Sequence, residues 1–360
     1  MNFKNTMHRI GLFVKKNAYA HFVVFGLLLV VVNLLRGIVF NNFFVNTVGI
    51  FLIFSIAVLG FYVLLGYGGL ASLGTSSFIG LGAFLARYFV HVLNMPFMIG
   101  LVLIMLIGII LGVGVGFISL RIEGMYLAII TLAISEIVVA LFRLTALNGL
   151  TGNFNGVSMP RKSILFGLIS LTTENMFVVI VIFFVIIMAL VYNLTKSPVG
   201  RAMLSMKNSE SAAQTMGVNL LKYRILAFVV ASVLAMVAGF LYMFNQRFAI
   251  LTEWNLNMSL NVLAAVVIGG TASIWGIVGG GFLIFGINAF LKNIDVFVKY
   301  PSLTLIFNGL LMIIVVLFYP GGLSQLYFKS KYYVTAWLKE RKAKTALKKG
   351  GNQDEVTAQN

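Results

Sequence analysis

The chain has 360 residues, of which 60% are hydrophobic and only 10% are charged, and its mean hydropathy is +1.02. Soluble domains carry about a quarter charged residues, so this composition excludes a soluble fold, a disordered chain and a fibrous repeat. The apolar runs are long and unbroken, which favours a polytopic all-α membrane protein over a β-barrel. The sequence contains no cysteine, so neither a disulfide framework nor thiol chemistry is available.

A helix that spans a membrane needs about 20 mostly apolar residues, and ten runs come close to that length. The expected spans are 17–35, 45–66, 77–92, 98–119, 125–142, 175–194, 225–246, 258–275, 277–292 and 303–319. The first run follows a basic stretch, as in a signal peptide, but no small-residue cleavage site follows it, so we interpret it as a retained anchor. We expect a transmembrane domain over residues 1–325 and a basic cytoplasmic tail over 326–360.

The net charge of +17 reflects orientation rather than a nucleic-acid partner. With ten spans and an internal N-terminus, 18 of the 26 lysines and arginines fall in the expected cytoplasmic segments and six in outer loops. This bias is the positive-inside rule, and it places both termini in the cytoplasm. We expect the tail to be a solvated helix or a disordered segment near anionic lipid headgroups.

A glycine-containing block repeats within the sequence. The six residues 68–73 recur at 269–274, and residues 82–85 recur at 280–283. Paired glycine-interrupted segments are typical of transporters built from repeats. Broken helices are tolerated only inside the protein or along a water-filled path, so we expect the block to form a pathway or gate. Close helix packing is the alternative for single glycines such as Gly112 and Gly116.

Glu136 is the one convincing acid inside an expected span. A carboxylate at that depth costs a few kcal/mol unless it is paired or faces water. Arg143, two helical turns later, and Arg87 in an earlier span are the candidate partners. The residue is therefore either a polar group facing a pathway or half of a buried structural ion pair.

Catalytic and metal-binding motifs are not found. The three histidines (His8, His21 and His91) are scattered, and neither H-E-x-x-H nor a G-x-S-x-G nucleophile elbow occurs. We therefore expect neither a metal site nor an enzyme. The P-loop pattern G-x-x-x-x-G-K-[ST] is also missing from the sequence, so any ATP would have to bind to another chain.

The predicted cytoplasmic loop 195–224 contains two short helices. Pro198 suits the start of the first, over 199–206. Asn208 or Ser209 can cap the second, over Glu210–Met216, which Gly217 ends. We interpret the pair as a docking element on the inner face, and a solvated connector is the alternative.

Charged and small apolar residues of this loop would make the docking contacts. Arg201, Lys207 and Glu210 offer charges, and Ala212 with Ala213 offers a small apolar knob for a pocket on a partner.

The loop 195–224 and several other segments resemble a known family. Glu210–Ala213 with Gly217 resembles the coupling loop of the permeases of ATP-binding cassette (ABC) importers. The similarity extends over about residues 45–325 to permeases of branched-chain amino-acid importers, in particular their LivM-type subunits. The segments that carry it are 66–74, 126–133 with Glu136, 150–156, 197–201, 269–276 and 319–323. Thr75 departs from the family, which often has His at this position. Ser76 and Ser77 also depart from it, because they stand where the family has small apolar residues.

The resemblance implies transport by alternating access in a bacterial cytoplasmic membrane, with no cofactor bound by this chain. The implied partners are two ATPase subunits that bind ATP and Mg²⁺, a second permease of the LivH type, and an extracytoplasmic substrate-binding protein. The residues expected to couple to the ATPase are Arg201, Glu210, Ala212, Ala213 and Gly217. Those expected along the substrate pathway are Gly69, Ser72, Thr75, Glu136, Gly270 and Ser273. Those expected to contact the binding protein are Thr151, Gly152, Asn153 and Asn155.

The substrate and the transporter class both have alternatives. Branched-chain amino acids are the expected substrates. The alternatives are nucleosides, simple sugars, urea or short amides, which related permeases carry. A secondary transporter or channel is the rival class, although such proteins often carry several intramembrane acids and need no docking loop. A purely structural membrane protein is disfavoured by the repeated glycine block.

Overall fold

The part of the chain that the structure describes is all-α apart from four strands of two residues each. The computed structural model describes residues 18–37, 41–118, 125–144, 155–160, 163–164, 169–170, 173–291, 297, 299–300, 302–319 and 321–325. The basic stretch before the first span and the tail over 326–360 lie outside the described residues.

The helices follow the expected spans closely, with some interrupted by π-helical or 3₁₀ segments (η). They are α2 (Ala18–Leu34), α3 (Asn42–Phe61), η1 (Tyr62–Tyr67), α4 (Thr75–Arg87), η2 (Tyr88–Val92), α5 (Phe97–Ile118), α6 (Met125–Phe142), α8 (Thr173–Lys196), α9 (Pro198–Asn208), α10 (Glu210–Thr215), α11 (Leu220–Gln246), η7 (Leu251–Glu253), α12 (Leu256–Gly269), α13 (Ile274–Gly281), η8 (Phe282–Gly286), α14 (Ile287–Leu291) and α16 (Ser302–Phe318). The strands are β1 (Val157–Ser158), β2 (Ser163–Ile164), β3 (Ile169–Ser170) and β4 (Phe248–Ala249), paired as β1–β4 and β2–β3.

Every expected span overlaps a helix, but one boundary is wrong. The run 258–275 was expected to be a single span, whereas α12 ends at Gly269 and α13 begins at Ile274. Glycine ends the helix although the apolar pattern continues. By length and composition, five helices in the described part of the chain can cross a membrane. They are Asn42–Tyr67, Phe97–Ile118, Asn175–Lys196, Leu220–Gln246 and Ile274–Leu291.

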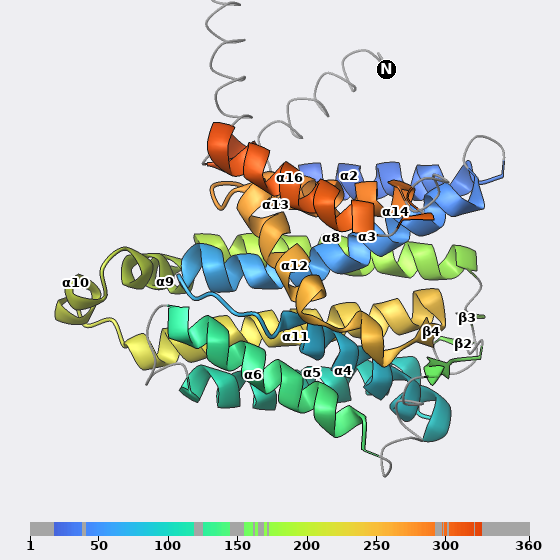
Figure 1. Cartoon of the computed structure of the whole chain (residues 1–360), viewed down its shortest axis with the longest axis horizontal. Coiled ribbons are helices and arrows are strands. Elements are labelled where there is room, and N and C mark those ends of the chain that lie inside the picture. Colours follow the sequence, from blue (N-terminus) through green and yellow to red (C-terminus); the bar gives the residue numbers. More distant parts are fainter. Residues whose placement is uncertain are drawn as a thin grey trace, which may run out of the picture.

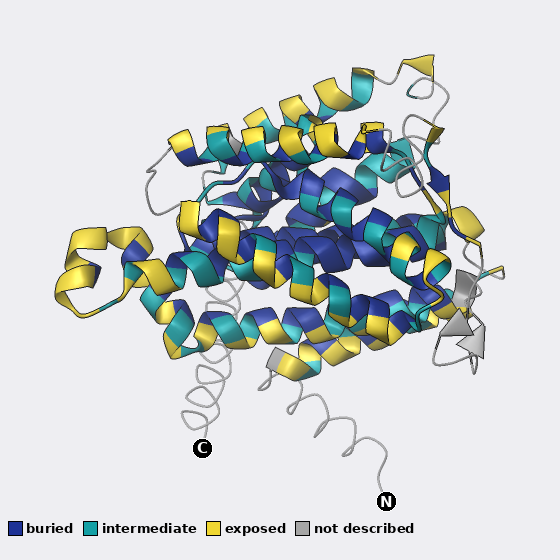
Figure 2. Cartoon of the chain, turned by 90° about the horizontal axis from the view of Figure 1, so that it is seen from below, coloured by how far each residue is buried: buried dark blue, intermediate teal, exposed yellow. Residues whose placement is uncertain are grey.

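Two long helices, α3 and α11, form the centre of the bundle. α3 is apolar on all sides and almost entirely buried, as such a helix must be when other helices surround it. α8, α12 and α13 pack around α3, while α4 and α5 pack on α11. Figure 1 shows these helices in layers, with α2 and α16 on one side and α5 and α6 on the other. Figure 2 shows the buried residues gathered in the middle.

Glycines bring α4 and α11 into backbone contact. A Cβ atom added to Gly239 would lie 1.8 Å from the carbonyl oxygen of Ile79, and one added to Gly82 would lie 2.2 Å from that of Met236. No side chain fits at either position without moving one helix. In a membrane protein such close approach is a main source of helix association.

Glycines four residues apart on α5 make a similar contact with α11. Gly108, Gly112 and Gly116 all face α11, whereas a Cβ on Gly114 would meet nothing within 4 Å. The hydroxyl of Ser232 donates to the carbonyl oxygen of Gly108 across this contact (2.8 Å). Helix packing therefore accounts for Gly112 and Gly116.

The close contact between α4 and α11 leads to a stability prediction. Gly239→Ala should destabilise the folded bundle by about 1–3 kcal/mol, because the new methyl group overlaps the backbone of α4. Gly114→Ala adds the same methyl group in open space and is the control. Thermal unfolding of both variants in detergent tests this, and equal melting temperatures would contradict it.

Candidate functional site

The first glycine break covers residues 68–74, between η1 and α4. The backbone N–H of Leu73 donates to Thr131 Oγ1 on α6 (2.9 Å). The backbone N–H of Ser76 donates to Ser259 Oγ on α12 (3.0 Å). Side chains of two other helices thus satisfy backbone groups that the broken helix leaves free, as a membrane interior requires.

Ser72 and Thr75, both expected on the pathway, are buried beside this break. Only 3% of Ser72 and 6% of Thr75 is exposed. Both line a void of about 10 Å³, which is the room of a single water molecule. The first break is therefore closed in this conformation, and the pathway role of the two residues stays a prediction.

The second break covers residues 270–273, between α12 and α13. A Cβ on Gly270 would lie 2.1 Å from the carbonyl oxygen of Gly321, and one on Gly322 would lie 2.5 Å from the backbone nitrogen of Gly270. The turn after α16 therefore packs directly on this break. Ser273 occupies the N-cap position of α13 without a capping hydrogen bond from its side chain.

The two copies of the repeated block have similar local structure. Gly69 and Gly270 occupy equivalent positions in the repeat, and both have positive φ, +68° and +76°. Glycine adopts this conformation far more readily than other residues. Gly82 and Gly280, also equivalent, each leave no room for a Cβ, which would lie 2.2 Å and 2.1 Å from carbonyl oxygens of α11 and α12. Close packing therefore explains this second pair.

Glu136 is exposed on α6. Arg143 lies in the turn that follows α6, and the guanidinium of Arg87 donates to the carbonyl oxygen of Ser158 (3.1 Å). Glu136 lines neither the small void nor the larger cavity described below. Within this chain it is therefore not brought together with the other expected pathway residues.

The loop expected to dock a partner projects from one end of the bundle as α9 and α10 (Figure 1). Three polar side chains cap its helices. Ser197 accepts from the N–H of Gly200, Ser209 accepts from that of Ala212, and Asn219 caps α11. The expected start at Pro198, the cap at Ser209 and the stop at Gly217, with φ of +78°, are confirmed.

The exposed apolar contact of this loop differs from the expected one. Ala213 is buried, with 3% of it exposed, so it cannot form a knob for a partner. Met216, just after α10, is 86% exposed and has the largest exposed fraction among the large hydrophobic residues described. Ala212 and Arg201 are exposed, as docking residues must be. Met216 is therefore the apolar side chain that this loop exposes, whereas Ala213 is buried.

Glu210 fixes the loop to the bundle. Its carboxylate accepts from the guanidinium of Arg224 on α11, and the side chain of Arg224 is only 6% exposed whereas that of Glu210 is 47% exposed. A buried guanidinium needs a partner, and this pair supplies it. Glu210 therefore connects α10 to α11 within the chain.

Lys207, at the end of α9, reaches the first glycine break. Its ammonium group donates to the carbonyl oxygen of Gly66 at the end of η1 (2.9 Å). A Cβ on Gly69 would lie 3.0 Å from the side chain of Lys207. A positive charge at a helix C-terminus is favourable, so this contact ties α9 to the break.

The opposite end of the molecule carries the small strands. Asn155 is exposed directly before β1, which pairs with β4 (Figure 1). Thr151, Gly152 and Asn153 lie outside the described residues.

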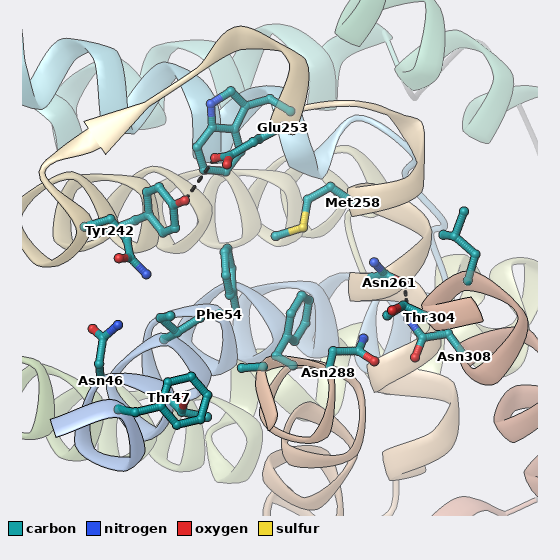
Figure 3. Close-up of a pocket in the computed structure, with 17 residues that line it drawn as sticks. Asn46, Thr47, Phe54, Tyr242, Glu253, Met258, Asn261, Asn288, Thr304 and Asn308 are labelled. Carbon is teal, nitrogen blue, oxygen red and sulfur yellow. Dashed lines mark hydrogen bonds between the residues drawn. The ribbon is translucent and has the colours of Figure 1, made fainter. Parts of the chain in front are cut away.

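A cavity of about 390 Å³ lies at this same end, between α3, α11, α12, α14 and α16. It is enclosed by aromatic rings and amide side chains (Figure 3). Its lining comprises Phe43, Asn46, Thr47, Ile50, Phe54, Tyr242, Gln246, Glu253, Trp254, Met258, Asn261, Phe285, Asn288, Ala289, Thr304, Leu305 and Asn308. It is of the size and character of small-molecule sites in proteins.

Comparison with known proteins identifies the family. The family described as "Branched-chain amino acid transport system / permease component" matches residues 43–316. The chain belongs to this family. Its match covers both glycine breaks, α9–α10 and the cavity.

Individual relatives agree with the family. The chain is 29% identical to the high-affinity branched-chain amino acid transport system permease protein LivM of Salmonella typhimurium, over 76% of this chain and 68% of the relative. Its identity to LivM of Escherichia coli is 28% over the same shares. The probable ABC transporter permease protein YphD of Escherichia coli is 31% identical over 28% of this chain and 34% of that protein. No solved structure matches the chain significantly.

The sequence did not predict the residues that the folded chain brings together around the cavity. None of the cavity residues was expected, because they come from α3, α11, α12, α14, α16 and the short segments η7 and η8, and share no motif. The number of asparagines near span ends is the signal that could have pointed to them. Met216 was missed because an exposed methionine looks like any other helix residue in an apolar sequence.

The Glu210–Arg224 pair gives a second prediction. Glu210→Ala leaves the buried guanidinium uncompensated and should destabilise α10 by about 1–3 kcal/mol. The change should appear as faster hydrogen exchange over residues 209–217. The double variant Glu210→Ala/Arg224→Met removes both charges and should recover most of the protection; unchanged exchange in the single variant would show that the pair does not hold α10.

Proposed function

We propose that this chain is a transmembrane permease subunit of an ABC importer for branched-chain amino acids, in the bacterial cytoplasmic membrane. The substrate assignment is supported by the family and by the names of the LivM relatives. The chain itself binds no nucleotide; ATP and Mg²⁺ bind to separate ATPase subunits that drive alternating access. An extracytoplasmic binding protein delivers the substrate.

One observation carries the mechanism: α9 and α10 project from one end of the bundle (Figure 1), and the residues that line the cavity lie at the other end. A partner that pulls on α9–α10 can act on the bundle at two points. Glu210 links α10 to α11, and Lys207 links α9 to the first glycine break. Since α11 packs against α3, α4 and α5, its movement changes the centre of the bundle.

The exposed side of α6 suits contact with a second permease subunit. Tyr126, Ile129 and Ile137 are each more than half exposed, and Glu136 is exposed beside them. A carboxylate against lipid costs a few kcal/mol, whereas the same group at a subunit interface can face protein or water. We therefore place the partner permease against α6, with Glu136 on the pathway between the subunits.

Transport in vesicles tests the proposal directly. Uptake of leucine into proteoliposomes should require this chain, its partner permease, the ATPase subunits, the binding protein and ATP on the cytoplasmic side. Uptake driven by an ion gradient without ATP would instead make the chain a secondary transporter or channel.

The coupling role of α10 gives a more local prediction. Met216→Asp places a charge on the most exposed apolar side chain of the loop, so it should weaken association with the ATPase about tenfold. Phe248→Asp, at the opposite end and also exposed, is the matched control. Copurification of the ATPase with each variant measures the effect, and equal recovery would remove Met216 from the interface.

A further inference from the structure

The cavity combines an apolar wall with polar ends. The rings of Phe54 and Phe285 stack with centroids 4.7 Å apart, and Tyr242 packs on Phe54 at 5.6 Å. Met258 lies opposite these rings (Figure 3). This wall suits a short aliphatic group.

Glu253 is the only lining residue among those described that carries a full charge at neutral pH. The hydroxyl of Tyr242 donates to its carboxylate (2.9 Å), which holds the carboxylate at the edge of the cavity (Figure 3). No lysine, arginine or histidine lines the cavity in the described part of the chain. The site therefore favours a cationic group and disfavours a net anion.

Two amide oxygens strengthen the preference of the cavity for a cationic group. Asn288 Oδ1 and Asn308 Oδ1 are buried, and neither has a hydrogen-bond partner among the described residues. Asn308 is only 7% exposed, and its amide nitrogen is directed to Asn261 Oδ1 (3.4 Å). Buried acceptors are rarely left unpaired, so these two are available to N–H donors of a ligand.

We propose that the cavity is the outward-facing solute site of the permease and that it takes a small solute bearing a primary ammonium group and a short apolar side chain. Glu253 selects the ammonium group, and the aromatic wall holds the side chain. The inference rests on the proposed function, which makes the solute an amino acid, and it places the entry of that solute at the end opposite α9–α10. Simple sugars, nucleosides and urea lack the ammonium group and are excluded as preferred solutes.

A thiol-protection experiment tests the site without requiring ATP-driven transport. The sequence contains no cysteine, so Thr304→Cys would place the chain's single thiol in the cavity lining. In the assembled transporter without ATP, leucine should slow modification of this thiol by a water-soluble methanethiosulfonate reagent at least about fivefold. 4-Methylpentanoate, which has the same carbon skeleton without the ammonium group, should give little protection. Thr252→Cys, exposed nearby but outside the lining, should be modified at the same rate with or without leucine.

The role of Glu253 is tested in the same background. Glu253→Gln keeps an acceptor for Tyr242 but removes the charge, so leucine should lose most of its protection of Thr304→Cys. In vesicles, the same change should raise the leucine concentration for half-maximal uptake about tenfold or more, because a charged hydrogen bond is lost. Thr252→Ala is the control for uptake, and melting temperatures show whether each variant folds.

The possible outcomes separate the inference from the proposed function. Equal protection by leucine with and without Glu253→Gln, or equal protection by ribose and leucine, would overturn the ammonium-selective site. Protection that depends on Glu253, together with uptake that does not need ATP, would support the site and overturn the ABC mechanism. ATP-dependent leucine uptake with an unprotected Thr304→Cys thiol would support the importer and place its solute site elsewhere.

Discussion

The structure depends on one constraint: wherever a helix breaks inside a membrane, the freed backbone groups must find partners within the protein. The two glycine breaks meet it in different ways. At the first, hydroxyl groups of Thr131 and Ser259 accept hydrogen bonds from the backbone. At the second, the backbone N–H of Gly270 donates to the carbonyl oxygen of Val266 (3.0 Å), and Gly321 and Gly322 let the turn after α16 pack directly on Gly270. Each break is therefore fixed by helices that are distant in sequence.

This arrangement makes the breaks natural points of movement. A break held by a few hydroxyl groups can exchange partners at lower cost than a continuous helix can bend. Lys207 of α9 donates to the carbonyl oxygen of Gly66, just before the first break, and its side chain packs beside Gly69 in the break itself. The salt bridge between Glu210 and Arg224 adds a second connection, to α11. These two contacts, together with the packing of α9 on α8, α11 and η1, join α9–α10 to the core of the bundle.

The closed first break and the open outer cavity together describe one state of the permease. Ser72 and Thr75 surround a void of about 10 Å³, whereas the cavity at the opposite end measures about 390 Å³. A solute of amino-acid size fits only the second. The conformation is therefore closed beside the first break and has its larger space at the end away from α9–α10.

The sequence by itself determined the class of fold, the helices, the repeated glycine block and the family, because hydrophobic length, helix caps and glycine spacing are local properties. Pro198, Ser209 and Gly217 define α9 and α10 by rules that act within a few residues. Only the tertiary structure decided that Ala213 is buried and Met216 exposed, that Glu210 pairs with Arg224, and that α12 ends at Gly269. It alone assembled the cavity around Glu253 from separate helical segments. In a chain this apolar, hydrophobicity cannot distinguish residues that face lipid from residues that face another helix, so the packing of helices far apart in sequence settles which side chains meet.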